Sequence, residues 1–193
     1  MKTAYIILAI VLIGVLLVSG AFIGAYNSLV SGKQNVNANF SQVRNEYQRQ
    51  SDLIPNVINT VQTYMQFEAK LLENITASQT QWQQALNSNS QLQQDQAGQG
   101  LSVSMGAFLA TTAKYPDLKS SSLIQTQIDE LEGAQNRITV ARMRYIDSVQ
   151  SYDTMVQSFP MNLVAGMFGF SQVEYYQGTA STAPPVVNMT IGI

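Results

Sequence analysis

The stretch TAYIILAIVLIGVLLVSGAFIGA, residues 3–25, decides the fold of this 193-residue chain. It carries no charged side chain, and nearly all of it is Ile, Leu, Val, Ala, Phe or Gly. A helix needs roughly 20 apolar residues to cross a bilayer, so this stretch is long enough to do so. We therefore expect residues 1–25 to form a transmembrane or apolar anchor helix.

Three arrangements fit this apolar helix. It can be a permanent transmembrane anchor, a cleaved signal peptide, or the buried core of a homopolymer such as a pilin-like filament. Lys2 and the small residues before Ala21 suit a signal peptide. The apolar run continues past that point to Ala25, which favours an uncleaved anchor held in membrane lipid. The polymer core remains the alternative.

Gly20 and Gly24 are four residues apart in this helix. They therefore share one helix face, where the absence of side chains lets two backbones approach closely. The pair is a candidate oligomerisation site within the anchor. The alternative is that glycine is simply frequent in membrane helices.

The sequence carries conflicting signals about which side of the membrane holds the rest of the chain. Lys2 precedes the helix, whereas Lys33, Arg44 and Arg49 follow it, which slightly favours a cytoplasmic location. A surface rich in Gln, Asn, Ser and Thr is instead typical of exported proteins. Three triplets fit the N-glycosylation pattern, at Asn39, Asn74 and Asn188. We expect a single-pass protein of the cell membrane with an extracytoplasmic body, or alternatively an extracellular assembly.

The composition excludes several classes of function. The net charge is −2 and charged residues make up 11% of the chain. No basic stripe is available to neutralise phosphates, so nucleic acid is not an expected partner. The chain has neither His nor Cys, which removes the usual catalytic triads and zinc sites. We expect no catalytic, cofactor-binding or metal-binding residues, and hence no enzyme; Asp129, Glu130 and Glu132 are interpreted as a solvated helix face.

The remainder of the chain predicts helices. Helical spacing continues from the anchor through residues 26–50, so the two segments are expected to form one rod. Asp52 and Pro55 predict a break and the start of a second helix, which extends to about residue 87. The Gln-rich segment 79–99 is interpreted as low-complexity, ending in a loop or loose helix, with a third helix over 101–114. Trp82 lies in this segment, either as a contact residue on an exposed tip or packed against the other helices.

The last long helix has the clearest pattern. Apolar residues recur from Ile124 to Phe159 at alternating steps of four and three, as a helix-bundle seam requires. Gln135 and Arg142 interrupt the pattern, and Glu46 or Asp52 is the expected partner of Arg142. The fold class is therefore predicted as all-α, with the N-terminal helix continuous with a helical body over residues 26–178.

Two uncharged segments follow. Residues 159–170 are dense in Phe, Met, Leu and Gly, and can cap the bundle, touch the membrane or dock on a neighbouring subunit. Phe168 and Phe170 are candidate interaction residues there. Residues 179–193 are expected to be a β-prone or disordered tail, which could pair with another copy.

Several short motifs together resemble the LemA family, which comprises membrane-anchored helical proteins of bacteria and archaea. They occur in the family's order, at YNSLV (26–30), DLIPNV (52–57), YPDLK (115–119), ELEG (130–133), NRI (136–138) and AGMFGF (165–170). The resemblance implies a membrane helix followed by a long antiparallel helical bundle, which we expect here to be a four-helix bundle over residues 26–178. Family members commonly have a cytoplasmic body, and the resemblance implies no defined activity. The chain departs from the family in its Gln-rich segment, at Phe40 and at Ile146-Asp147.

Two functional hypotheses follow. The first is a non-enzymatic, membrane-anchored scaffolding protein that forms a homo-oligomer through its apolar helix and its bundle. The second is an adaptor that binds another envelope protein through the Gln-rich tip around Trp82. A filament subunit with a buried N-terminal helix is a variant of the first.

Overall fold

The computed structural model describes residues 2–61, 69–115 and 121–175. These residues form five helices and no strand: α1 (Lys2–Val61), α2 (Ala69–Leu86), α3 (Gln91–Thr112), α5 (Ser122–Gln157) and α6 (Met161–Phe168). The predicted all-α class and apolar N-terminal helix are confirmed. Residues 179–193, predicted to be a tail, lie outside the described ranges.

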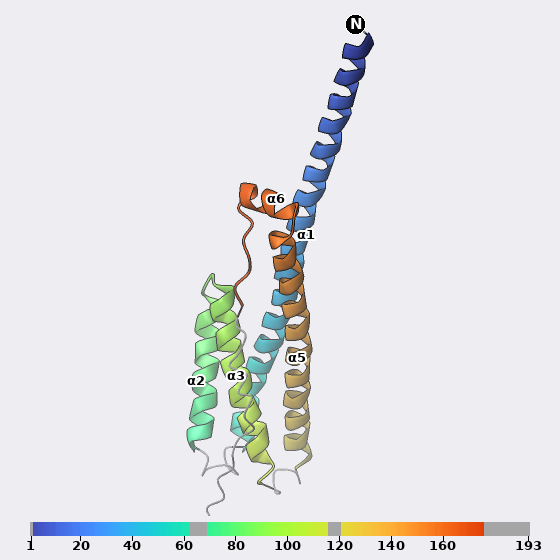
Figure 1. Cartoon of the computed structure of the whole chain (residues 1–193). Coiled ribbons are helices and arrows are strands. Elements are labelled where there is room, and N and C mark those ends of the chain that lie inside the picture. Colours follow the sequence, from blue (N-terminus) through green and yellow to red (C-terminus); the bar gives the residue numbers. More distant parts are fainter. Residues whose placement is uncertain (1, 62–68, 116–120, 176–193) are drawn as a thin grey trace, which may run out of the picture.

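Helix α1 runs without interruption from the apolar stretch into the rest of the molecule. Its N-terminal part extends alone beyond the other helices (Figure 1). The most apolar part of α1 is long enough to cross a membrane, and none of it is buried within the chain. The prediction of one continuous rod is therefore confirmed.

The predicted helix break at Asp52 and Pro55 is wrong, because α1 continues through Pro55 to Val61. Proline lacks the N–H that would donate to the carbonyl four residues earlier, which here belongs to Ser51. Gln79 Nε2 of α2 donates to the Ser51 carbonyl at 2.9 Å instead. Because Ile54 and Val57 are buried on either side of the exposed ring, packing also holds this turn in place.

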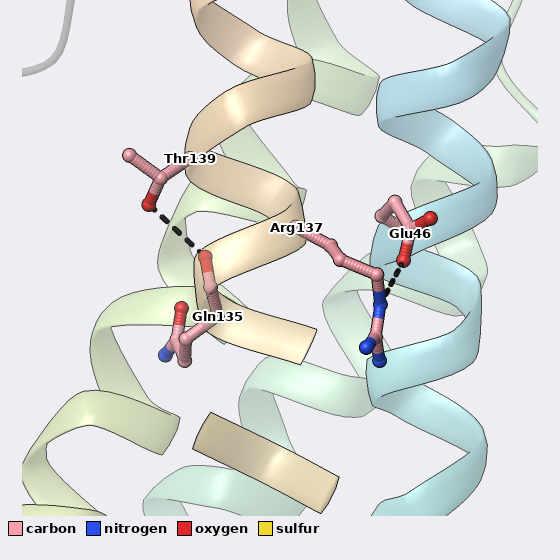
Figure 2. A network of polar contacts seen from close by, with 4 residues as sticks. All are labelled: Glu46, Gln135, Arg137 and Thr139. Atoms are coloured by element: carbon pink, nitrogen blue, oxygen red, sulfur yellow. Dashed lines mark hydrogen bonds and ion pairs between the residues drawn. The ribbon is translucent and has the colours of Figure 1, made fainter. Parts of the chain in front are cut away.

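Helices α1 and α5 form the most extensive interface and run antiparallel (Figure 1). Lys33 lies over the Tyr152 ring at 5.4 Å, and Phe40 contacts Tyr145 with ring centroids 5.3 Å apart. Further along, Arg137 Nε donates to Glu46 Oε2 at 3.1 Å, as Figure 2 shows. Apolar and polar contacts therefore fix one register along the whole pair.

Helices α2 and α3 form an antiparallel hairpin beside this pair (Figure 1). The predicted third helix was placed too late, because α3 begins at Gln91 rather than near residue 101. Ser90 caps it, accepting a hydrogen bond from the Gln93 backbone N–H at 3.3 Å. Glutamine is a good helix former, so low sequence complexity did not indicate a loop here.

The seam predicted for the last helix is largely confirmed. From Ile124 to Tyr152 its apolar members are buried in α5. The two polar exceptions have partners on α3: Gln135 and Ser102 exchange two hydrogen bonds of 2.6 Å, and Arg142 pairs with Asp95. Phe159 is wrong as a seam member, since α5 ends at Gln157 and the Phe159 side chain is 80% exposed.

A close approach between α3 and α1 yields a stability prediction. A methyl group added to Gly98 would overlap the Tyr47 ring, whereas one added to Gly100 would meet nothing within 4 Å. We expect Gly98→Ala to lower the free energy of unfolding by about 1–3 kcal/mol, as overpacking does. Gly100→Ala should instead be neutral or slightly stabilising, because alanine favours the helix. Urea unfolding of the two variants measures the difference, and equal midpoints would contradict this packing.

Candidate functional site

The apolar stretch of α1 presents an exposed surface. Its Leu, Ile and Val side chains are exposed along the protruding segment. A methyl group added to Gly20 or Gly24 would meet no neighbouring atom within 4 Å, so the face that they share is open. Their role in oligomerisation stays a prediction, but nothing in the described part of the chain covers the site.

The segment 159–170, which we name the collar, lies where α1 leaves the other helices (Figure 1). Val164 and Ala165 of α6 are buried against Ala25 and Leu29 of α1, forming a hydrophobic cluster separate from the main core. Gly169 ends α6 in the left-handed conformation, with φ of 74°, and the Phe170 N–H donates to the Ala165 carbonyl at 2.9 Å.

Phe168 and Phe170, the predicted interaction residues of the collar, both contact Tyr26 of α1. The ring centroids are 4.9 Å and 5.7 Å from that of Tyr26, in edge-on arrangements. Phe168 also lies 6.4 Å from Phe22, yet it remains more than half exposed. These aromatic contacts hold the collar against α1 while leaving an apolar side uncovered.

Trp82 is a core residue, and its prediction as a contact residue is corrected by its complete burial. Its ring packs on Tyr47 at 5.4 Å, and its Nε1 donates to Gln48 Oε1 at 3.2 Å. The alternative of packing against the other helices is therefore the observed one.

Several amides of the Gln-rich segment contact α1. Gln79 and Gln83 donate to Ser51, and Gln91 donates to Asn37 Oδ1 at 3.1 Å. These glutamines supply hydrogen bonds between helices.

Other side chains of the same segment are exposed, among them Gln81, Gln84, Gln93 and Gln96. The adaptor hypothesis therefore loses Trp82 as its contact residue, whereas binding of another protein by the exposed amides stays a prediction.

A buried ion pair joins α3 to α5. Arg142 Nη1 donates to Asp95 Oδ1 and, at 3.2 Å, to the Tyr47 hydroxyl. The expected partners of Arg142 were wrong: Glu46 binds Arg137, and Asp52 is exposed on α1 and accepts from Gln48. Asp95 was a detectable signal, because it is the single charged residue between Ser78 and Thr112.

Burial also raises the pKa values of the two tyrosines beside this ion pair. Removal from water, with a smaller contribution from the Asp95 charge, raises the pKa of Tyr145 to about 12. Burial also raises the pKa of Tyr47, against the opposing effect of Arg142. Both phenols therefore stay neutral at physiological pH; the Tyr47 hydroxyl accepts a hydrogen bond from Arg142, and the Tyr145 ring packs on Phe40.

The predicted glycosylation acceptors lie in different surroundings. Asn39 is half-buried in α1 and its amide donates to the Asn35 carbonyl at 3.0 Å. Asn74 is exposed on α2, and Asn188 lies outside the described residues. Their use stays a prediction, and Asn74 is the accessible one of the two that are described.

No catalytic constellation is found in the described ranges. They hold no group of three or more metal-ligating side chains. Asp129, Glu130 and Glu132 are exposed on α5, and Asp129 accepts a hydrogen bond from Gln125 at 2.7 Å. The interpretation of these acids as a solvated face fits this placement.

Comparison with known proteins adds distant relatives. The chain is 24% identical over 88 residues to the magnetosome proteins MamQ 1 and MamQ 2 of Paramagnetospirillum magneticum, covering 46% of this chain and 32% of each relative. It is 23% identical over 92 residues to the magnetosome protein MamQ of Magnetospirillum gryphiswaldense, covering 48% of this chain and 34% of that relative. The matched region thus spans about a third of the length of these curated relatives.

A family comparison covers much more of the chain. The model of the LemA family matches residues 39–189, which include the end of α1 and the described helices α2, α3, α5 and α6. LemA proteins are helical and membrane-associated, in agreement with the exposed apolar helix described above. On this match, together with the motifs that first suggested it, the chain belongs to the LemA family.

Proposed function

We propose that this protein is a non-enzymatic, membrane-anchored scaffold that assembles into a homo-oligomer. The observation that carries the proposal is the open apolar surface of α1, which nothing else in the described chain covers. In water such a surface would be strongly unfavourable, because each exposed Leu or Ile forgoes about 1.5–3 kcal/mol of burial. Lipid and a second copy of α1 would together cover this apolar surface.

The Gly20 and Gly24 face supports contact between copies. Both positions are open, and a face without side chains lets two helix backbones come within packing distance in lipid. The rest of the chain is suited to hold such copies in a fixed arrangement, since α1 passes directly into the helical body without a flexible joint.

We further propose that α2, α3, α5 and the part of α1 from residue 26 onward form an antiparallel four-helix bundle. Their shared hydrophobic core supports this, because it draws buried residues from all four helices. A rigid bundle on a single membrane helix suits a scaffold, because it presents a long surface.

The side of the membrane is also part of the proposal. The surface rich in Gln, Asn, Ser and Thr supports an extracytoplasmic body, and other envelope proteins are then accessible partners. The chain has no native cysteine, so single cysteines can be placed at will. A membrane-impermeant thiol reagent applied to intact cells distinguishes the two sides at a cysteine introduced for exposed Leu123.

The test of self-assembly uses paired glycine variants in lipid nanodiscs. Replacing Gly20 and Gly24 together by leucine should raise the dissociation constant of the oligomer at least about tenfold, equivalent to about 1.4 kcal/mol. Gly14→Leu is the matched control, because Gly14 is equally open and lies on a different face of the same helix.

Energy transfer between differently labelled copies measures the association. The proposal predicts lower transfer in the double variant and unchanged transfer in the control. If both variants associate as the native chain does, the glycine face is not the contact. Filaments in electron micrographs of the purified protein would instead favour a polymer with α1 as its core.

A further inference from the structure

The collar is held at one fixed height along α1. Val164 and Ala165 pack beside Ala25 and Leu29, and the Phe168 ring contacts both Phe22 and Tyr26. These α1 residues mark the point where the apolar stretch ends. When the apolar stretch lies in a bilayer, the collar therefore lies at the edge of that bilayer.

The outer side of the collar is apolar and uncovered. Four large side chains remain exposed there: Phe159 at 80%, Leu163 at 56%, Met167 at 72% and Phe168 at 55%. Leu163 and Met167 are four residues apart and share one face of α6, opposite the buried Val164 and Ala165. The inner side of α6 already closes the end of the core, so capping does not account for the outer side.

Charge is absent at this level of the molecule. Residues 154–173 carry no charged side chain, and neither do residues 3–32 of α1. The charges that bound these two stretches are Lys33, which lies over the Tyr152 ring, Asp153, whose carboxylate accepts from the Val173 N–H at 3.0 Å, and the exposed Glu174. These residues mark where contact with water is required.

The dimensions agree with a bilayer edge at the collar. Residues 3–25 span roughly 35 Å as a helix, which fills a hydrocarbon core of about 30 Å with little to spare. Tyr26 then falls in the interfacial region, where aromatic side chains with a polar end are favoured. The uncharged collar falls at the same depth.

We propose that the collar is a second membrane-binding element, lying in the boundary between head groups and acyl chains of the bilayer that holds α1. Its outer face is continuous with the apolar surface of α1 through Phe168 and Phe22, which is the argument for lipid as the occupant. Short amphipathic helices bind lipid in this way, with their apolar side buried about 5–10 Å into the boundary. The collar thereby fixes the depth and tilt of α1 and holds the body close to the surface. This inference requires α1 to sit in lipid but does not require self-assembly.

The experiment places a lipid-sensitive fluorophore on single cysteines of the full chain in phosphatidylcholine vesicles. Leu163→Cys and Met167→Cys report on the collar. Leu123→Cys is the matched control, because Leu123 is the same residue type as Leu163 with similar exposure, 61%, and lies at the far end of α5. All three sites are on the surface, and thermal unfolding checks that each labelled variant folds like the native chain.

Lipids brominated near the upper part of the acyl chain act as the quencher. We expect them to reduce emission at positions 163 and 167 at least about twofold and to leave position 123 unchanged. Aqueous iodide should show the reverse order. Two results would overturn the proposal: equal iodide access at all three positions, or energy transfer between copies at 163 without bromolipid quenching, which would make a second copy the occupant. Self-assembly through the glycine face can fail while this lipid contact holds, so the two proposals are tested separately.

Discussion

Replacing Asp95 by alanine is expected to lower the free energy of unfolding of the helical body by about 3–5 kcal/mol. Both members of the ion pair are buried, so the variant leaves the Arg142 guanidinium in the core without its carboxylate. The loss of a single partner costs far more than the pair itself contributes, because the remaining charge keeps its desolvation penalty. Urea unfolding of the detergent-solubilised chain, followed by circular dichroism, measures the change.

Two further variants make this prediction specific. Arg144→Ala removes an exposed arginine from the same helix and should change the unfolding free energy by less than about 0.5 kcal/mol. Replacing Asp95 and Arg142 together by leucine should recover most of the stability, since a buried pair is often no better than apolar residues of similar size. A double variant as unstable as Asp95→Ala would show that the pair has a role other than mutual neutralisation.

Trp82→Ala is expected to destabilise the body by a similar amount, about 3–5 kcal/mol. The side chain is completely buried between α2 and α1, so its removal leaves a large cavity against Tyr47 and takes away the donor to the Gln48 amide oxygen. Trp82→Phe should cost markedly less, because the ring contact is retained and only the indole hydrogen bond is lost.

The control for Trp82 is an exposed apolar residue. The exposed Leu123 side chain does not pack against the core residues that the structure describes. The unfolding free energy of Leu123→Ala should therefore stay within about 0.5 kcal/mol of the native value. If Trp82→Ala were as mild as this control, the side chain would have to be at the surface. The prediction of Trp82 as a contact residue would then regain its basis.

The helices that could be predicted from the sequence are those with a long, regular pattern of apolar residues. The apolar run of α1 and the seam of α5 are long and regular, so both helices followed from spacing. The predicted helix break at Pro55 is wrong, and no local sequence pattern shows the reason. The carbonyl that proline leaves without a donor is satisfied by Gln79, a residue of another helix.

The candidate site divides in the same way. Phe168 was recognisable as a candidate from the uncharged segment around it, but its contact with Phe22 and Tyr26 depends on α5 returning to the level of α1 where the body ends. Asp95 stood alone in an uncharged stretch, which marked it as unusual. Its pairing with Arg142 required knowing that the Gln-rich segment is helical, and compositional reasoning suggested a loop.

We propose above that copies of this membrane-anchored chain assemble with one another in lipid. Step counting of a single fluorophore, attached through Leu123→Cys, in sparsely loaded phosphatidylcholine vesicles tests it most directly. Each copy then carries one dye, because the chain has no other cysteine. We expect most particles to bleach in two or more steps, and in fewer steps when Gly20 and Gly24 are replaced by leucine. Single-step bleaching of nearly all particles of the otherwise native chain would contradict it.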